Sequence, residues 1–282
     1  MDRMIYFNER IVDIEQAAVD VTTGGLLYGW GVFTTLRITG GRAFALDRYL
    51  DRLAQHAEKA RVPFPDDSES LKRGVRDLIS ANSVQEGRAR ITLLRGNAGG
   101  WRIAAGRESE VLIFTSSEAQ SPQRSIEITV SPFRLLSSSP LAGIKRTAMT
   151  ENLLALEEAR SRGFAEAVIL NERGEIVSAT AGNIFWVEGD ELLTPALATG
   201  CVAGITRGFV CEIARRIGIH LIEGSFPTQR LLDANELFLT STARQIMPVA
   251  GFDIKQYGPK PGQITRNITR EFQRLVRDAK MK

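Results

Sequence analysis

The feature that most constrains the fold is a series of short apolar segments joined by tight turns in the second half of the chain. Residues 167–170 and 175–177 are predicted strands joined by NERG, and residues 183–187 and 191–193 are predicted strands joined by EGD. Such short loops return the chain beside the strand that it has just left, so each pair is a predicted antiparallel hairpin. Regular alternation of strands and helices is therefore not expected.

The first half of the chain also contains hairpins, and it places helices between them. Strands are predicted at residues 4–7, 10–12, 32–39, 42–46, 89–94 and 111–115. Asp47 suits a helix N-cap, and apolar residues follow it at helical spacing until Pro63. Residues 66–68 can cap a second helix. These segments predict a mixed α+β architecture.

A polar stretch near the middle of the chain predicts a boundary between two domains. Residues 116–124 contain Ser, Gln and Pro and show no apolar period. We expect a small N-terminal α/β domain at residues 1–117, a linker at residues 118–124 and a larger C-terminal domain at residues 125–282 that carries Lys145.

The C-terminal half contains further predicted strands and helices around the two hairpins. A strand at residues 126–130 precedes a Ser/Pro-rich loop that runs through Pro140. Thr206 is predicted to cap a helix that Gly218 closes. The remaining predictions are helices at about residues 150–162, after Pro227 and at 266–282, and strands at 219–223 and 236–240.

The bulk composition is ordinary and excludes several classes of protein. The net charge is +3 and the basic residues form no dense block, so nucleic-acid binding is not indicated. The two cysteines, Cys201 and Cys211, match no metal or redox spacing and are expected to be free thiols, and no metal site is predicted. No signal peptide and no apolar span of about 20 residues is present, so we expect a cytoplasmic protein that does not bind membranes.

The residues that could carry chemistry are dispersed, and each has an ordinary explanation. Lys145 lies in a short stretch of small and apolar residues, where a lysine is usually a solvated charge. Thr206, Ser241 and Thr242 suit helix or loop starts, where hydroxyls act as caps and also bind phosphate. Arg52 lies on a helix face, where most arginines are surface cations. Taken singly, these residues leave the function open.

Taken together and in order, these residues match motifs of a known family. The segments are LYGWGVFTTLR at 27–37, LDRYLDRL at 46–53, GIK at 143–145 followed by NLLA at 152–155, SATAGNIF at 178–185 with LLT at 192–194 and GITR at 204–207, and LTSTARQI at 239–246. The chain resembles the class IV, or branched-chain-aminotransferase-like, pyridoxal-phosphate enzymes. This group includes branched-chain and D-amino acid aminotransferases and aminodeoxychorismate lyases. The resemblance covers nearly the whole chain and implies the family's two-domain fold, with a β-barrel-like core in the larger domain.

The resemblance also implies a cofactor, pyridoxal 5′-phosphate, and a role for each matched residue. Lys145 would bind the cofactor as a Schiff base and later move a proton. Desolvation by its apolar neighbours would lower its pKa, which suits both tasks. The implied cofactor contacts are Arg52, Lys145, Ser178, Asn183, Ile205, Thr206, Ser241 and Thr242, and the implied substrate contacts are Phe33, Arg95 and Ala243.

The chain departs from the family pattern at three positions. Ser178 stands where the family has a glutamate that keeps the pyridine nitrogen of the cofactor protonated. Met149 stands where branched-chain enzymes have a tyrosine, and Trp30 replaces an aspartate of the first motif. A serine at position 178 would leave the pyridine nitrogen less protonated, so the ring would draw electrons less strongly. This change should slow transamination more than elimination. Glu175 or a water could restore the protonation if it took the place of the glutamate.

These departures favour a lyase reaction among the activities of the family. Thr34 and Thr35 resemble the lyase branch, and residues 95–97 lack the Arg-x-His of D-amino acid enzymes. The leading hypothesis is therefore an aminodeoxychorismate lyase-like reaction, which converts 4-amino-4-deoxychorismate to 4-aminobenzoate and pyruvate. One alternative is an aminotransferase that acts on branched-chain or D-amino acids with 2-oxoglutarate. Another is a cofactor-binding protein with little activity, because Ser178 replaces the glutamate.

The resemblance also predicts the assembly. In the family, the site lies between the two domains and a loop of a second subunit covers it. We therefore expect a homodimer that takes a small-molecule amino substrate, with residues 95–107 as the covering loop.

Overall fold

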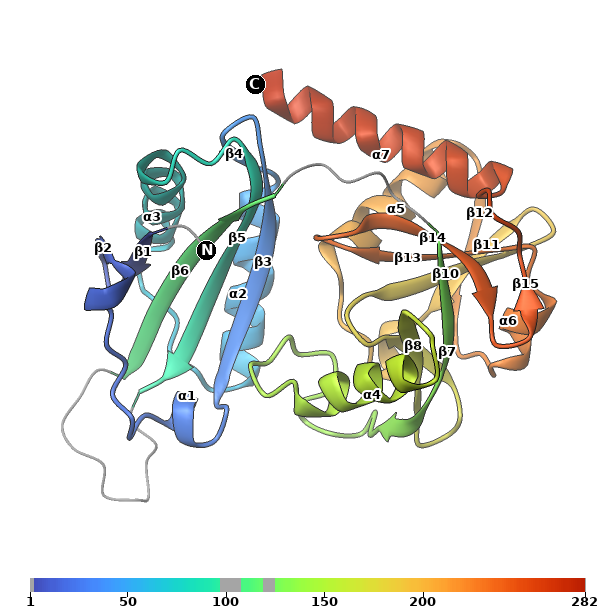
Figure 1. Ribbon diagram of the computed structural model, residues 1–282, viewed down its shortest axis with the longest axis horizontal. Helices are drawn as coiled ribbons and strands as arrows, with labels where there is room; N and C mark the ends of the chain where they lie inside the picture. The colour runs from blue at the N-terminus through green and yellow to red at the C-terminus, as the bar shows by residue number, and fades with distance from the viewer. Residues whose placement is uncertain (1–2, 97–107, 119–124, 282) are drawn as a thin grey trace. The chain divides into compact units, whose positions relative to one another are not determined.

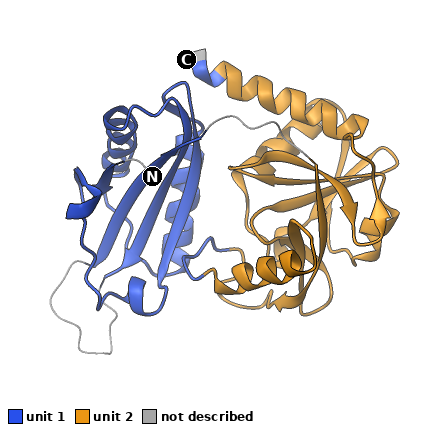
Figure 2. Cartoon of the chain, in the orientation of Figure 1, with its two compact units in different colours: residues 1–121, 144–148, 279–282 blue, residues 122–143, 149–278 orange. Residues whose placement is uncertain are grey.

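The computed structural model describes residues 3–96, 108–118 and 125–281 of the chain (Figure 1). Its contacts divide the chain into two compact units (Figure 2). Unit 1 consists of residues 1–121, Ile144–Ala148 and Ala279–Lys282, and unit 2 consists of the rest. The short segment that carries Lys145 therefore groups with unit 1. The linker expected at 118–124 stays a prediction, since residues 119–124 lie outside the described part.

Unit 1 is built on an antiparallel sheet with the strand order β2-β1-β6-β5-β3-β4. The strands are β1 (Met4–Phe7), β2 (Arg10–Asp13), β3 (Gly31–Thr39), β4 (Arg42–Ala43), β5 (Glu86–Arg95) and β6 (Ser109–Ser117). Asn8 and Glu9 form the turn between β1 and β2, and both have positive φ, as a two-residue hairpin turn requires. The long central strands β3, β5 and β6 carry fully buried side chains such as Leu36 and Ile91.

Three helices complete unit 1: α1 (Gly24–Leu27), α2 (Leu46–Lys59) and α3 (Ser68–Ala81). Helix α2 packs on β3, and α3 packs on β1 and β6. Asp67 caps α3 as predicted, because its carboxylate accepts a hydrogen bond from the backbone N–H of Glu69 at 2.9 Å. The prediction that Asp47 caps α2 is wrong. The helix begins at Leu46 after Ala45, which turns the chain with a φ of 54°, and Asp47 lies within the first turn.

Unit 2 is built on a larger sheet with the strand order β12-β11-β10-β13-β14-β7-β8-β9, and β15 pairs with β14. The strands are β7 (Ile126–Leu135), β8 (Glu166–Asn171), β9 (Ile176–Ala179), β10 (Asn183–Glu188), β11 (Glu191–Pro195), β12 (His220–Gly224), β13 (Glu236–Ser241), β14 (Gln245–Phe252) and β15 (Lys255–Gln256). Strand β9 ends the order at one edge, yet it also contacts β10 and β11. The sheet therefore curls back on itself and forms the barrel-like core that the family resemblance implies.

The core of unit 2 lies inside this curled sheet. Trp186 is fully buried there, and its ring meets that of Phe226 edge to face at 5.0 Å. The helices are α4 (Thr150–Ser161), α5 (Ile205–Arg216), α6 (Gln229–Asp233) and α7 (Gln263–Met281). Strands β7 and β8 are parallel, as are β11 and β12, so α4 and α5 each lie in a parallel crossover. Unit 2 thus combines the predicted hairpins with two crossovers.

Two strands of unit 2 differ from the sequence-based expectation. Strand β7 continues to Leu135, whereas residues 131–135 were expected to belong to a loop. Its pairing register shifts between Val130 and Arg134, which accommodates Pro132 without a ladder hydrogen bond from its nitrogen. Strand β14 was not predicted at all, because Pro248 interrupts its apolar run.

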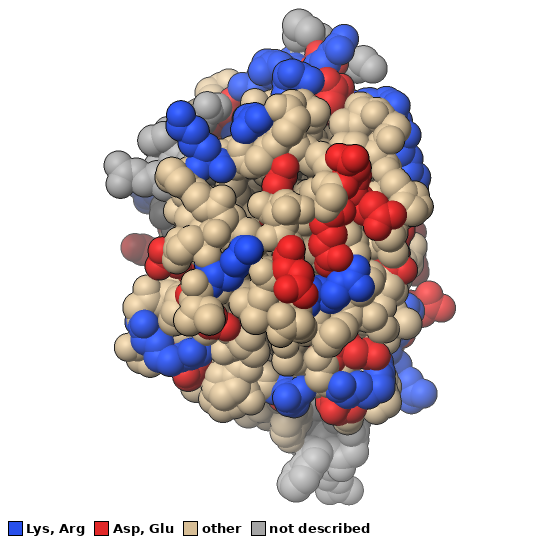
Figure 3. Space-filling view, turned by 90° about the vertical axis from the view of Figure 1, so that its right-hand side faces the viewer, with Lys and Arg blue, Asp and Glu red and all other residues tan. Residues whose placement is uncertain are grey.

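The composition gives expectations for the surface charges, the helices and the cysteines. Figure 3 shows acidic and basic side chains intermixed over one face of the molecule. Within the described residues, no helix is both long enough and apolar enough to cross a membrane. Cys201 and Cys211 are buried free thiols, as predicted.

Candidate functional site

The backbone around Lys145 is fixed along the start of β3. Val32 and Arg146 form an isolated antiparallel bridge. The Phe33 N–H donates to the Lys145 carbonyl at 3.0 Å, and the Thr147 N–H donates to the Gly31 carbonyl at 2.9 Å. A Cβ at position 31 would lie 2.7 Å from the Leu93 carbonyl and 2.9 Å from Thr147 Oγ1, so only glycine allows this close approach.

The side chain of Lys145 lies in a setting that favours its neutral form. Its Nζ is 4.5 Å from the ring centre of Phe33. Burial, followed by the charges of Arg52 and Arg90, lowers the pKa of Lys145 to about 8. At pH 7, about a tenth of such amines are neutral, which is roughly 300 times the fraction for an ordinary lysine. This amine is therefore suited to nucleophilic attack on a carbonyl.

Two arginines concentrate positive charge beside this amine. Arg52 is buried on α2, where its Nη2 donates to the Thr34 hydroxyl at 2.8 Å. Arg90 comes from β5, and its guanidinium carbon lies 3.7 Å from the ring centre of Phe33. Burial lowers the pKa of both guanidinium groups. The sequence analysis missed Arg90. No motif contains this residue, and it comes close to Lys145 only because β5 pairs with β3.

A histidine that sequence reasoning also passed over contacts the backbone of Lys145. The Lys145 N–H donates to Nδ1 of His56 at 3.1 Å, across 89 positions of sequence. His56 is buried on α2, and burial together with nearby cations lowers its pKa to about 4. No local pattern marks such a residue, since only the tertiary contact gives it a role.

In unit 2, strand pairing and side-chain hydrogen bonds fix the family motif at residues 178–185. Ser178 is half-buried on β9 and pairs with Ile169. The Thr180 N–H and hydroxyl donate to buried Glu166, and the Asn152 side chain donates to the Thr180 carbonyl at 2.9 Å. Asn183, at the start of β10, pairs with Thr240 of β13. Thus the turn between β9 and β10 is tied to α4, β8 and β13.

The start of α5 lies against Asn183. The Asn183 amide donates to the Val202 carbonyl at 2.8 Å, and a Cβ at residue 204 would collide with its Oδ1. Gly204 is therefore the N-cap, and Thr206 lies inside the helix, so the prediction that Thr206 caps α5 is wrong. The N-cap supplies no side-chain hydrogen bond. The first N–H groups of α5, at Ile205 and buried Thr206, can serve an anion.

The loop after β13 contains the remaining predicted residues. The Arg244 N–H donates to the Ser241 hydroxyl at 3.1 Å, and Thr242 is half-buried while Ala243 is exposed. The Arg244 guanidinium lies 3.3 Å from a carboxylate oxygen of buried Glu166. The same carboxylate therefore secures both this loop and the turn before Asn183.

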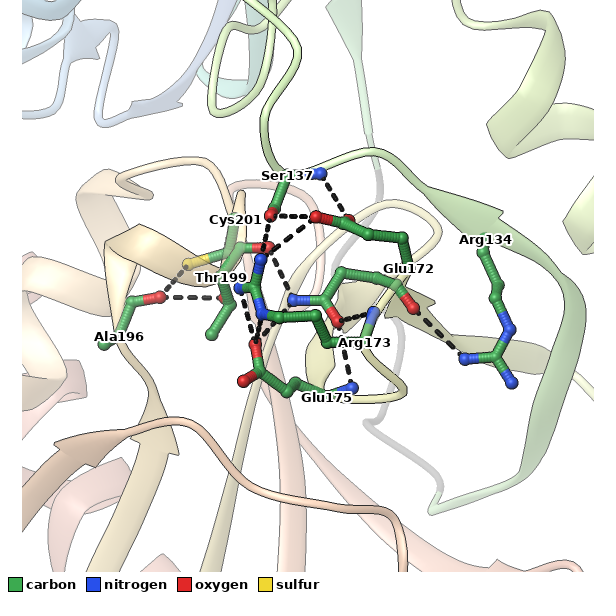
Figure 4. Close-up of polar contacts among 9 residues, drawn as sticks. Arg134, Ser137, Glu172, Arg173, Glu175, Ala196, Thr199 and Cys201 are labelled. Atoms are coloured by element: carbon green, nitrogen blue, oxygen red, sulfur yellow. Dashed lines mark hydrogen bonds and ion pairs between the residues drawn. The ribbon is translucent and has the colours of Figure 1, made fainter.

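Glu175 is engaged in a polar network at the turn between β8 and β9 (Figure 4). Its Oε2 accepts hydrogen bonds from Asn171 and Arg173, both at 2.7 Å. Arg173 also donates to Ser137, whose N–H and hydroxyl donate to Glu172 and help lower the pKa of Glu172 to about 2. These bonds hold Glu175 in the turn, which argues against it as a replacement for the family glutamate.

The predicted site residues fall into one set in each unit. Phe33, Arg52 and Lys145 are close together in unit 1. Arg95, at the end of β5, donates to the Arg61 carbonyl at 2.6 Å, and its guanidinium lies 5.4 Å from the Trp30 ring. The set in unit 2 comprises Ser178, Asn183, Ile205, Thr206, Ser241, Thr242 and Ala243. Most of the covering loop expected at 95–107 lies outside the described residues, and among those described no cluster of three or more metal-ligating side chains occurs.

The donor groups fit a phosphate-bearing aldehyde such as pyridoxal 5′-phosphate. The Lys145 amine can react with an aldehyde, because its pKa is lowered. The positive charge of Arg52 and the N–H groups that begin α5 suit a phosphate. In each unit a close approach requires glycine, at Gly31 beside the lysine segment and at Gly204 beside Asn183.

Comparisons with known proteins agree with this chemistry. The family model for amino-transferase class IV matches residues 31–252. The chain is 31% identical to a putative branched-chain-amino-acid aminotransferase of Methanocaldococcus jannaschii, over 95% of this chain and 94% of that protein. It is 27% identical to an aminodeoxychorismate lyase of Bacillus subtilis, over 98% and 95%. The crystal structure of an Escherichia coli branched-chain aminotransferase matches with a TM-score of 0.91 and 28% identity, over 98% of this chain and 95% of that one.

Proposed function

Because this chain belongs to the class IV aminotransferases, a family of enzymes that use pyridoxal 5′-phosphate, we propose that it transfers the amino group of a small amino acid to 2-oxoglutarate. The products are a 2-oxo acid and glutamate. The observation that carries this proposal is the Lys145 amine, whose pKa of about 8 leaves it reactive near neutral pH. The full-length similarity to branched-chain aminotransferases favours this reaction over the lyase reaction that the sequence motifs suggested.

Lys145 is the proposed catalytic residue and acts at its Nζ. The neutral amine attaches the cofactor and, once released, takes the proton from the substrate Cα as a general base. When bound, pyridoxal phosphate supplies a ring that accepts the electrons of that bond. Burial, followed by the charges of Arg52 and Arg90, raises the neutral fraction of Nζ, and contact with Phe33 keeps the side chain out of bulk water.

The remaining residues are proposed to bind and orient. Arg52 would neutralise the cofactor phosphate, and the N–H groups of Ile205 and Thr206 with the hydroxyls of Thr206 and Thr242 would donate to its oxygens. Ser178 would face the ring nitrogen, and Asn183, whose amide donates to the Val202 carbonyl, would form the wall beside the ring.

Arg90 is the proposed partner of a substrate carboxylate. Its guanidinium is half-buried, lies against Phe33 and comes close enough to Lys145 to lower its pKa. A planar guanidinium binds carboxylates in a bidentate way, which suits an acidic co-substrate such as 2-oxoglutarate. Residues 241–243, which the Glu166–Arg244 ion pair secures, are proposed to meet the substrate α-carboxylate.

An aminodeoxychorismate lyase reaction is the second candidate, and Ser178 is the observation that favours it. A hydroxyl leaves the ring nitrogen less protonated than a carboxylate does, which slows transamination more than elimination. Glu175 is held in its turn by Asn171 and Arg173, so it offers little compensation.

One assay separates the two candidates. The purified protein with pyridoxal phosphate is incubated with branched-chain L-amino acids, or with D-alanine, and 2-oxoglutarate, and in parallel with 4-amino-4-deoxychorismate. We expect glutamate in the first set and no pyruvate in the second. Pyruvate without glutamate would replace the aminotransferase by the lyase. Absence of both products, with the cofactor bound, would indicate a cofactor-binding protein.

The Ser178→Glu variant tests the account of the ring nitrogen. A carboxylate at this position should restore protonation of the nitrogen and raise the rate of glutamate formation by up to about tenfold. Ser138→Glu, on an exposed residue of the same unit, is the control. An unchanged rate in Ser178→Glu would show that Ser178 does not face the ring.

The assembly and location are parts of the same proposal. We propose a homodimer, in agreement with the family resemblance, and a cytoplasmic location, in agreement with the two free thiols. Sedimentation of the active protein tests the first, since an active monomer would contradict a dimer.

A further inference from the structure

The backbone N–H of Lys145 is satisfied in an unusual way. The bridge to β3 uses the Lys145 carbonyl, which accepts from Phe33, and the Thr147 N–H, which donates to Gly31. The Lys145 N–H does not join this bridge and instead donates to Nδ1 of His56. A single side chain therefore completes the hydrogen bonding of the reactive lysine's own peptide group.

His56 reaches this position because of its place on α2. It follows Arg52 by one helical turn, so the two side chains lie on the same face of the helix. Helix α2 packs on β3, where Arg52 donates to Thr34 and the neighbouring Phe33 bonds to Lys145. One helix face thus contacts both the strand and the lysine segment that β3 holds.

The contact requires a neutral imidazole. Nδ1 can accept a hydrogen bond only when it carries no proton, so the proton of the neutral ring is assigned to Nε2. Burial of His56, followed by the charges of Arg52 and Lys59 on its own helix and of Lys145 opposite, lowers its pKa to about 4. Near neutral pH the ring therefore stays an acceptor.

We propose that His56 is a positioning residue, which fixes the Lys145 backbone so that its amine stays against Phe33 and close to Arg52 and Arg90. The inference rests on the proposed role of Lys145 but concerns a different residue. Without the acceptor, the lysine segment loses an anchor, and the amine moves toward water, so its pKa rises part of the way toward that of an ordinary lysine.

A matched pair of variants tests the role of the acceptor. His56→Asn places its Oδ1 near the position of Nδ1 and can still accept from the Lys145 N–H. His56→Leu is of similar size and cannot accept. His220, the other histidine, is exposed and pairs with Glu191, so His220→Leu is the control for loss of a histidine.

The first measurement uses the protein without cofactor. Acetic anhydride labels only neutral amines, and mass spectrometry of the Lys145 peptide gives the labelling rate against pH. We expect a midpoint near pH 8 for the parent, His56→Asn and His220→Leu. For His56→Leu we expect a midpoint about one unit higher and a tenfold lower rate at pH 7. Equal midpoints in His56→Leu and His56→Asn would overturn the proposal.

The second measurement does not depend on whether the His56→Leu variant folds. Hydrogen–deuterium exchange of the peptide that spans Ile144–Ala148 in the parent should show a protected Lys145 amide, and His56→Asn should keep it. A freely exchanging amide in the parent would overturn the proposal.

Borohydride reduction with pyridoxal phosphate then separates this inference from the proposed function. No labelled Lys145 in the parent would refute the function, whereas amide protection would still support the role of His56.

Discussion

The two sets of site residues use different physical means. In unit 1, Lys145, Arg52 and Arg90 are charged groups partly removed from water, and each has a lowered pKa. In unit 2, Asn183 and Thr206 offer neutral donors held by backbone geometry, and the buried carboxylate of Glu166 has Arg244 beside it. The first arrangement controls the protonation of the Lys145 amine, and the second controls the positions of the neutral donor groups. Substitutions in unit 1 should therefore alter reactivity and pH dependence, whereas those in unit 2 should alter binding.

The largest effect is expected from Lys145→Ala. In the proposed mechanism Lys145 attaches the cofactor and acts as the general base, so turnover should fall by about 10³-fold or more without its amine. Lys72→Ala, which removes an amine paired with Asp47 and Glu69 on the same unit, should leave turnover unchanged. Glutamate formation from amino acid and 2-oxoglutarate measures both. A Lys145→Ala variant within tenfold of the parent would show that the reactivity does not reside in unit 1.

Arg52→Gln should have the next largest effect. A buried charged hydrogen bond to phosphate contributes about 1.5–3 kcal/mol, so the Kd for pyridoxal phosphate should rise about 10–100-fold. The pKa of Lys145 should also rise, because a nearby positive charge is lost and any gain in solvent contact acts in the same direction. Absorbance titration measures the Kd, and exposed Arg48→Gln is the control. An unchanged Kd would contradict the role of Arg52.

The pH dependence of the free energy of unfolding tests the environment of His56 in unit 1. The pKa of His56 is about 4 in the folded protein and near 6.5 when unfolded, so between these values the unfolded chain binds more protons. Stability from this group is complete above pH 6.5 and falls as the pH drops toward 4. Between pH 6.5 and 5 the loss is about 1–2 kcal/mol. Urea unfolding should show this loss in the parent and a smaller loss in His56→Asn. Equal losses would contradict a lowered pKa of His56 in the folded protein.

The smallest effect is expected in unit 2. Thr206→Val keeps the shape of a buried side chain but removes its hydroxyl, which should raise the Kd for pyridoxal phosphate by less than about tenfold. Labelling of Lys145 should keep its midpoint near pH 8. Thr228→Val, before α6, is the control. A shifted labelling midpoint of Lys145 in Thr206→Val would show that a residue of unit 2 also influences the protonation of Lys145.

The sequence predicted those parts of the fold that local patterns determine. Hairpin turns, the Asp67 cap and the amphipathic helices depend on residues close together in the chain. Strand β14 was missed because Pro248 argues against a strand, although its partners β13 and β7 hold it in the sheet. Asp47 and Thr206 were misplaced as caps because the backbone turns earlier, at Ala45 and Gly204.

The candidate site was predictable only where motifs name it. Lys145, Arg52 and Asn183 belong to recognisable segments, and the structure gives each of them specific contacts. Arg90 and His56 carry no such pattern. Their relation to Lys145 depends on strand pairing and on a helix packed against β3, which a single sequence does not specify.

The connectivity of the two units has a consequence for protein engineering. The chain passes between the units after residues 121, 143, 148 and 278 (Figure 2). A protease nick within residues 118–124 would therefore divide the chain into two fragments, and the C-terminal fragment would carry the Ile144–Ala148 segment of unit 1. A chimaera joined at that point would pair one parent's β3 with the other parent's Ile144–Ala148. Exchange of the halves between relatives would need to transfer that pentapeptide together with the N-terminal part.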